Sequence, residues 1–136
     1  MKTLLWLDDY RDPNEIKDGV KHWLVFSPIP DPYALVWVKS YAEFTSYITE
    51  HGLPDGICFD HDLGLAVAIE ARANGMSKRQ ARKLKPLELT GMDCAKWLVD
   101  YCIDNKKKLP LFNIQSANPV GKENIHKLLT NFLKSY

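Results

Sequence analysis

Residues 3–9 read Thr-Leu-Leu-Trp-Leu-Asp-Asp, a continuous apolar run that ends in Asp8 and Asp9. Such a run, bounded by charge, is typical of a strand that is buried on both faces of a parallel sheet. Residues 56–62 repeat the arrangement, because Gly-Ile-Cys-Phe leads directly into Asp-His-Asp. Two buried strands that each end in aspartates predict acidic side chains at one edge of the sheet.

Further strands and helices are expected to alternate along the chain. Apolar runs at 34–38 and 111–114 predict two more buried strands. Ser40 and Glu43 have the spacing of a capping box, a second helix is expected to begin at Thr90, and a third follows Gly121. This alternation favours right-handed βαβ crossovers, so we predict an α/β fold: a doubly wound parallel sheet in a receiver- or flavodoxin-like three-layer sandwich, with strand order 2-1-3-4.

Two stretches lie outside this pattern. Residues 11–33 contain four of the eight prolines and read as irregular, with a short apolar segment at 23–26 that could pair at a sheet edge. Residues 65–88 read as an inserted helical segment that is alanine-rich at first and basic later. Because 136 residues suit one domain, we expect residues 1–136 to form a single domain that carries this insertion.

Composition argues against several classes of partner. The formal net charge is +1, so nucleic-acid or membrane binding would need a local patch. Residues 78–85 hold five basic side chains, but no aromatic residues lie among them to stack bases, and a solvated helical face is the favoured interpretation. No apolar run approaches the ~18 residues that span a bilayer, so a soluble cytoplasmic protein is expected. The three cysteines show no zinc spacing and are expected to be reduced and buried.

The aspartates suggest a metal site. In the order 2-1-3-4 the first and third strands are neighbours, and ligands bind between their carboxyl ends. Asp8, Asp9 and Asp60 would then converge, and oxygen ligands of this kind suit Mg²⁺ or Mn²⁺. The alternative is that Asp8 or Asp9 caps the following segment and that Asp62 caps a helix.

Other polar residues are candidates for work on phosphate. Asp60 could be a metal ligand or a nucleophile toward phosphorus, and His61 or Asp62 could transfer protons. After the fourth strand come Ser116, Asn118, Gly121 and Lys122, which would form a phosphate cradle at a helix start. Equally, Asn118-Pro119 is a simple turn and Lys122 a solvated side chain.

Four ordered motifs give the chain a family resemblance. Leu-Trp-Leu-Asp-Asp, Phe-Asp-His-Asp-Leu-Gly, Thr-Gly-Met-Asp-Cys-Ala-Lys-Trp-Leu and Gln-Ser-Ala-Asn-Pro-Val-Gly-Lys-Glu-Asn-Ile together resemble the cyclic-phosphate processing receiver domains. The resemblance implies a receiver-like fold in which Asp8 and Asp9 match the acidic metal-binding pair and Asp60 matches the phosphoacceptor position. Ser116-Ala117 matches the small hydroxyl pair that follows the fourth strand.

The resemblance also implies a function. It suggests a metal-dependent phosphodiesterase or phosphohydrolase that acts on cyclic phosphates, such as RNA 2′,3′-cyclic ends or cyclic nucleotides, often in conflict between phage and bacteria. A module that binds a nucleotide, a nucleic-acid end or a protein partner without catalysis is the alternative. Family members tend to carry histidine where this chain has Gln115, which favours that alternative if the histidine transfers protons. Nothing after Ile125 supplies the fifth strand and lysine of a conventional receiver, so no phosphorelay output role is expected.

Overall fold

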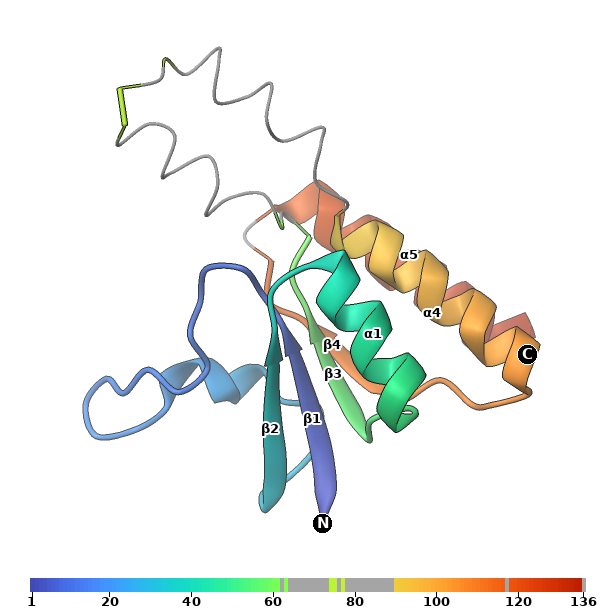
Figure 1. Ribbon diagram of the computed structural model, residues 1–136, viewed down its shortest axis with the longest axis horizontal. Coiled ribbons are helices and arrows are strands. Elements are labelled where there is room, and N and C mark those ends of the chain that lie inside the picture. Colours follow the sequence, from blue (N-terminus) through green and yellow to red (C-terminus); the bar gives the residue numbers. More distant parts are fainter. Residues whose placement is uncertain (62, 64–73, 76, 78–89, 117, 136) are drawn as a thin grey trace.

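Four parallel strands form the sheet of the computed structural model, which describes residues 1–61, 63, 74, 75, 77, 90–116 and 118–135 (Figure 1). They are β1 (Lys2–Leu7), β2 (Tyr33–Val38), β3 (Gly56–Phe59) and β4 (Leu111–Ile114). Their order is β2-β1-β3-β4, which confirms the predicted topology. Leu7 at the end of β1 pairs with Phe59 at the end of β3, so the residues that follow these two strands leave the sheet side by side.

Three described helices cover one face of the sheet: α1 (Tyr41–His51), α4 (Gly91–Asn105) and α5 (Pro119–Ser135) (Figure 1). The core beneath them contains alternate residues of the central strands, among them Leu5, Leu7, Ile57 and Phe59. Local sequence sets the helix starts as expected. The Ser40 hydroxyl accepts a hydrogen bond from the Glu43 N–H at 3.1 Å, and Thr90 and Asp93 cap α4 reciprocally.

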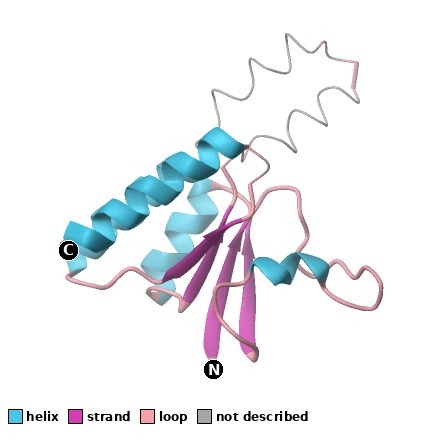
Figure 2. Cartoon of the chain, turned by 180° about the vertical axis from the view of Figure 1, so that it is seen from behind, coloured by secondary structure: helices cyan, strands magenta, loops and turns pink. Residues whose placement is uncertain are grey.

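The opposite face is covered by the stretch between β1 and β2, which contains the 3₁₀-helix η1 (His22–Phe26) (Figure 2). The expectation of an edge strand at 23–26 was wrong. Trp23, Leu24 and Phe26 instead pack over Leu4, Trp6 and Cys58 on this face, where their apolar side chains are partly buried. The irregular stretch therefore forms the third layer of the sandwich.

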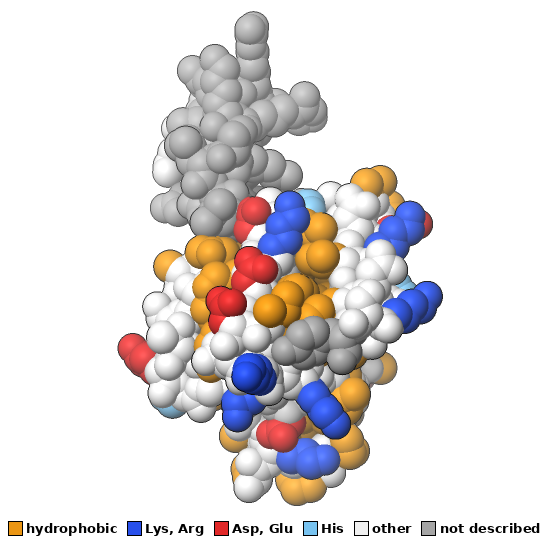
Figure 3. All heavy atoms as spheres, turned by 90° about the vertical axis from the view of Figure 1, so that its right-hand side faces the viewer, with side chains coloured by type: hydrophobic (Ala, Val, Ile, Leu, Met, Phe, Trp, Pro, Cys, Tyr) orange, Lys and Arg blue, Asp and Glu red, His pale blue; other side chains and the backbone are white. Residues whose placement is uncertain are grey.

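The state of the cysteines and the mixture of surface charges agree with what the composition predicts. Cys58, Cys94 and Cys102 are free thiols and are buried. Acidic and basic side chains both appear on the face drawn in Figure 3, with apolar side chains exposed between them. No helix in the described ranges has the length and apolar character needed to cross a membrane. The expected helical segment at 65–88 lies almost wholly outside the described residues.

Candidate metal centre

Asp8 is fixed at the end of β1 by the neighbouring strand. Its backbone N–H donates to the Val38 carbonyl at 3.1 Å, and the Trp37 indole N–H donates to the Asp8 carbonyl at 2.6 Å. The residue is completely buried. A buried carboxylate requires compensating partners, and these determine what Asp8 can still bind.

Asp60 is held at the end of β3 by two different elements. Its N–H donates to the Leu7 carbonyl at 3.0 Å, and only 3% of the residue is exposed. On its other side, the N–H of Gly91 at the start of α4 donates to the His61 carbonyl at 2.9 Å. A Cβ on Gly91 would overlap the Asp60 carbonyl oxygen, so this close approach requires glycine. The sequence pattern around 90–91 predicts a helix start but not this contact.

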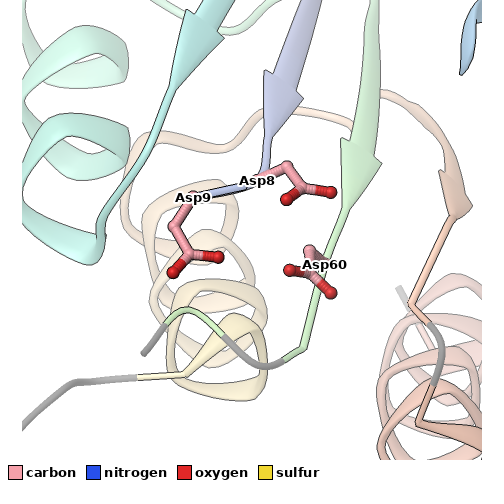
Figure 4. Close-up of side chains that lie close together, drawn as sticks. All are labelled: Asp8, Asp9 and Asp60. Carbon is pink, nitrogen blue, oxygen red and sulfur yellow. The ribbon is translucent and has the colours of Figure 1, made fainter. Parts of the chain in front are cut away.

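The carboxylates of Asp8, Asp9 and Asp60 meet as predicted (Figure 4). Each offers a ligand oxygen, and the three oxygens lie within 4.8 Å of one another. Mg²⁺ holds its ligands at about 2.0–2.1 Å, which places opposite oxygens about 4.2 Å apart. A small inward movement of the side chains would therefore let them share one ion. The cluster can hold a metal ion, while the fourth predicted carboxylate, Asp62, lies outside the described residues.

Arg11 contributes a cation that the sequence analysis did not identify. Its Nη1 lies 3.1 Å from Asp8 Oδ2 and 3.8 Å from Asp60 Oδ1. Asp8 Oδ1 also accepts hydrogen bonds from the N–H groups of Tyr10 and Arg11, both at 2.9 Å. The turn after β1 thus brings a positive charge back to the carboxylate that precedes it. A basic residue three positions after an aspartate is too common a pattern to predict such a contact.

Gln115 lies beneath the cluster. It follows β4, and its Nε2 donates to the Leu7 carbonyl at 3.0 Å, the same oxygen that accepts from Asp60 N–H. Its side chain therefore extends across the end of β3 toward β1. Only 4% of Gln115 is exposed, yet its Oε1 has no hydrogen-bond partner in the described part of the chain. A buried amide oxygen in that state can still accept a hydrogen bond from a ligand or water.

His61 and Gly121 form one packing unit. A Cβ on Gly121 would overlap the imidazole of His61, lying 2.6 Å from Cδ2 and 2.7 Å from Nδ1. The ring is therefore seated on the first turn of α5. The space that the sequence analysis assigned to a phosphate at Gly121 is occupied on this side by His61.

The other predicted cradle residues mainly cap α5. Asn118 Oδ1 accepts from the Gly121 N–H at 3.0 Å, and Ser116 Oγ accepts from the Asn118 N–H at 3.1 Å. Pro119 has no N–H, so two of the first three helical positions offer no spare donor to a phosphate. Lys122 is exposed on the first turn. The capping interpretation thus accounts for Asn118 and Gly121, and the Ser116 hydroxyl can still donate a hydrogen bond.

Comparison with known proteins identifies the family. The model of the cyclic-phosphate processing receiver domain matches residues 3–131, which is nearly the whole chain. The comparisons with curated proteins and with solved structures gave no match. The matched range contains both strand ends that carry the acidic cluster and all four strands in receiver-like order. The chain belongs to the family of cyclic-phosphate processing receiver domains.

Proposed function

We propose that the domain is a metal-dependent phosphodiesterase that hydrolyses cyclic phosphates, such as RNA 2′,3′-cyclic ends or cyclic nucleotides. The observation that carries the proposal is the convergence of Asp8, Asp9 and Asp60 within 4.8 Å at the carboxyl ends of β1 and β3. This is the edge at which open parallel sheets bind ligands. The family has been linked to cyclic-phosphate processing, which supports this choice of substrate.

The charges at the site support a divalent ion. Three carboxylates gather there, and Arg11 lies beside two of them, Asp8 and Asp60. Gathering several carboxylates in a largely buried place is costly, and a divalent cation would offset part of that cost. The ligands are all oxygen atoms, which suits Mg²⁺ or Mn²⁺. When bound, such an ion polarises a phosphoryl oxygen and lowers the pKa of a coordinated water.

The reaction requires a proton to leave water and a proton to reach the leaving oxygen. The water oxygen bonds to phosphorus, one ring P–O bond breaks, and the freed ribose oxygen takes up a proton, which yields a phosphomonoester. His61 or Asp62 would transfer these protons, because both follow Asp60 directly. The His61 ring is held against α5, so its position relative to Asp60 is constrained. The Ser116 hydroxyl could donate to a non-bridging oxygen of the phosphate.

Gln115 favours a second candidate function, which is binding without hydrolysis. A neutral amide does not exchange a proton near neutral pH, and Nε2 is already committed to the Leu7 carbonyl. If the reaction needs an acid or a base at this position, the same crevice would retain a cyclic nucleotide or an RNA end without cleaving it.

A turnover assay separates the two functions. The protein is incubated with Mg²⁺ or Mn²⁺ and a panel of 2′,3′- and 3′,5′-cyclic nucleotides and RNA with a cyclic end. The phosphomonoester product is then quantified. Asp60→Asn should abolish metal-dependent turnover. Asp55→Asn is a matched control at the opposite end of β3, where Asp55 Oδ2 accepts from the Thr3 N–H at 2.8 Å, and it should retain activity. Metal binding without any turnover would support the binding module, and lack of metal binding would refute the metal-dependent hydrolase.

A further inference from the structure

Arg11 places its guanidinium beside the carboxylates of the acidic cluster, and its side chain is not fully buried. Its Nη1 lies between Asp8 and Asp60, at 3.1 and 3.8 Å from their carboxylate oxygens. The side chain is 17% exposed, whereas the side chain of Asp8 is fully buried. An anionic ligand that binds at this cluster would therefore meet a cation as well as carboxylates.

The position of Arg11 is fixed from three directions. Its own N–H donates to Asp8 Oδ1 at 2.9 Å, and its carbonyl accepts from the Trp6 indole N–H at 3.0 Å. The guanidinium carbon lies 5.3 Å from the centroid of the Trp23 ring, which is a cation–π contact. Because the main chain and the guanidinium are both held, little side-chain freedom remains to be lost when a ligand binds.

The guanidinium has donors to spare. It carries five N–H groups in a planar fork, and its side-chain ion pairs with the described residues use Nη1 alone. Phosphate oxygens match this fork, and arginine commonly binds them through two parallel hydrogen bonds.

We propose that Arg11 is a phosphate-binding residue of this site. The proposal rests on the proposed function, because it assumes that Asp8, Asp9 and Asp60 hold a divalent ion. An ion held by Asp8 and Asp60 would be a neighbour of Arg11, so that one phosphate group could contact both cations. The ion and Arg11 together would bring positive charge to the three carboxylates, which would lower the repulsion that a singly charged phosphodiester meets there.

A purely structural role for Arg11 predicts something different. If Arg11 only held Asp8 in position, its replacement would weaken metal binding and phosphate binding in parallel. If Arg11 binds phosphate, its replacement removes a positive charge from beside the metal site, so metal affinity should stay the same or rise while phosphate affinity falls. The two affinities must therefore be measured separately.

The experiment uses Mn²⁺ alone and then inorganic phosphate at saturating Mg²⁺. Free Mn²⁺ is followed by electron paramagnetic resonance, and phosphate binding is followed by calorimetry. Arg11→Gln should bind Mn²⁺ at least as tightly as the wild type and phosphate about tenfold or more weakly. Arg11→Lys should have a phosphate affinity between those of the wild type and Arg11→Gln, because lysine keeps the positive charge but lacks the planar guanidinium. Lys21→Gln removes an exposed charge from the same stretch and should change neither affinity.

The outcomes distinguish the two proposals. Failure of the wild type to bind Mn²⁺ would overturn the proposed function and this inference with it. Mn²⁺ binding by the wild type without phosphate binding would overturn the inference alone, as would unchanged phosphate affinity in the folded Arg11 variants. Parallel loss of Mn²⁺ and phosphate affinity in Arg11→Lys would assign Arg11 a positioning role and would also overturn the inference. Circular dichroism checks the fold, and if Arg11→Gln does not fold, Arg11→Lys decides the question.

Discussion

Replacement of Gly91 by alanine should damage the metal centre from outside its ligand set. Gly91 begins α4, and its Cα faces the chain where β3 ends. A Cβ there would overlap the Asp60 carbonyl oxygen and would lie 2.8 Å from the Asp60 carbonyl carbon and 3.0 Å from His61 Cα. All three atoms belong to the backbone, so no rotation of a side chain relieves the contact.

The contact with the Asp60 carbonyl oxygen sets the size of the expected movement. Real Cβ atoms essentially never come closer than 3.0 Å to another heavy atom, so the helix start and the Asp60–His61 backbone must separate by roughly 1 Å or more. Both sides are anchored, because Cys94 and Leu98 of α4 and Phe59 of β3 are fully buried. Overpacking of this kind costs about 1–3 kcal/mol of stability. Displacement of Asp60 should weaken Mn²⁺ binding by about 10–100-fold, as is typical when the support of a metal ligand is lost.

Two measurements and one control check this reasoning. Urea unfolding gives the loss of stability, and a Mn²⁺ titration gives the loss of affinity. Gly56→Ala is the matched control at the far end of β3, where a Cβ would lie 3.1 Å from Ile29 and 3.2 Å from Pro28, both side-chain contacts. Gly56→Ala should lower the free energy of unfolding and leave the Mn²⁺ affinity unchanged. A folded Gly91→Ala protein that binds Mn²⁺ as the wild type does would refute the argument.

Three further predictions follow from other contacts. Gly121→Ala should displace the His61 ring, seen as a shift of its imidazole NMR signals, while Mn²⁺ affinity is retained; unchanged signals would contradict the packing described above. Ser40→Ala removes the cap of α1 and should lower the free energy of unfolding by about 1 kcal/mol in urea titrations, and no loss would mean that the cap is dispensable. Burial raises the pKa of Cys58 from 9.0 to about 12 and also raises that of Cys94. Unfolded thiols therefore release protons at lower pH than folded ones, so the urea concentration at the unfolding midpoint should fall as pH rises from about 9 toward 12. A midpoint that does not change over this range would contradict the raised pKa of the buried thiols.

The fold could be predicted from the sequence because its strands are buried on both faces. Continuous apolar runs such as 3–7 and 56–59 have few other stable environments, and Ser40 and Thr90 mark helix starts by local chemistry. The segment 23–26 could not be assigned in this way. Four apolar residues suit an edge strand and a 3₁₀ turn equally well, and only the exposed sheet face beneath them decides which forms.

Of the candidate site, only the three carboxylates that could bind a metal were predicted correctly from the sequence. Asp8, Asp9 and Asp60 follow strands whose order can be inferred, so their convergence follows from topology. The roles of Gly91 and Gly121 depend on how closely two helix starts approach the end of β3, and no pattern along the chain encodes that distance. Gly121 lies against the His61 ring, which the sequence did not indicate, and its role in a phosphate cradle stays a prediction.

Arg11 shows how the irregular layer enters the chemistry of the site. Trp6 points from β1 into the face that this layer covers, and its indole N–H holds the Arg11 carbonyl. Trp23 packs on the same face and lies against the guanidinium, while its own N–H donates to Glu15 at 2.9 Å. The turn from Asp8 to Arg11 and the Trp23 ring thus hold one guanidinium from two sides. The irregular stretch after β1 therefore covers this face of the sheet and also places a cation beside the carboxylates at the strand ends.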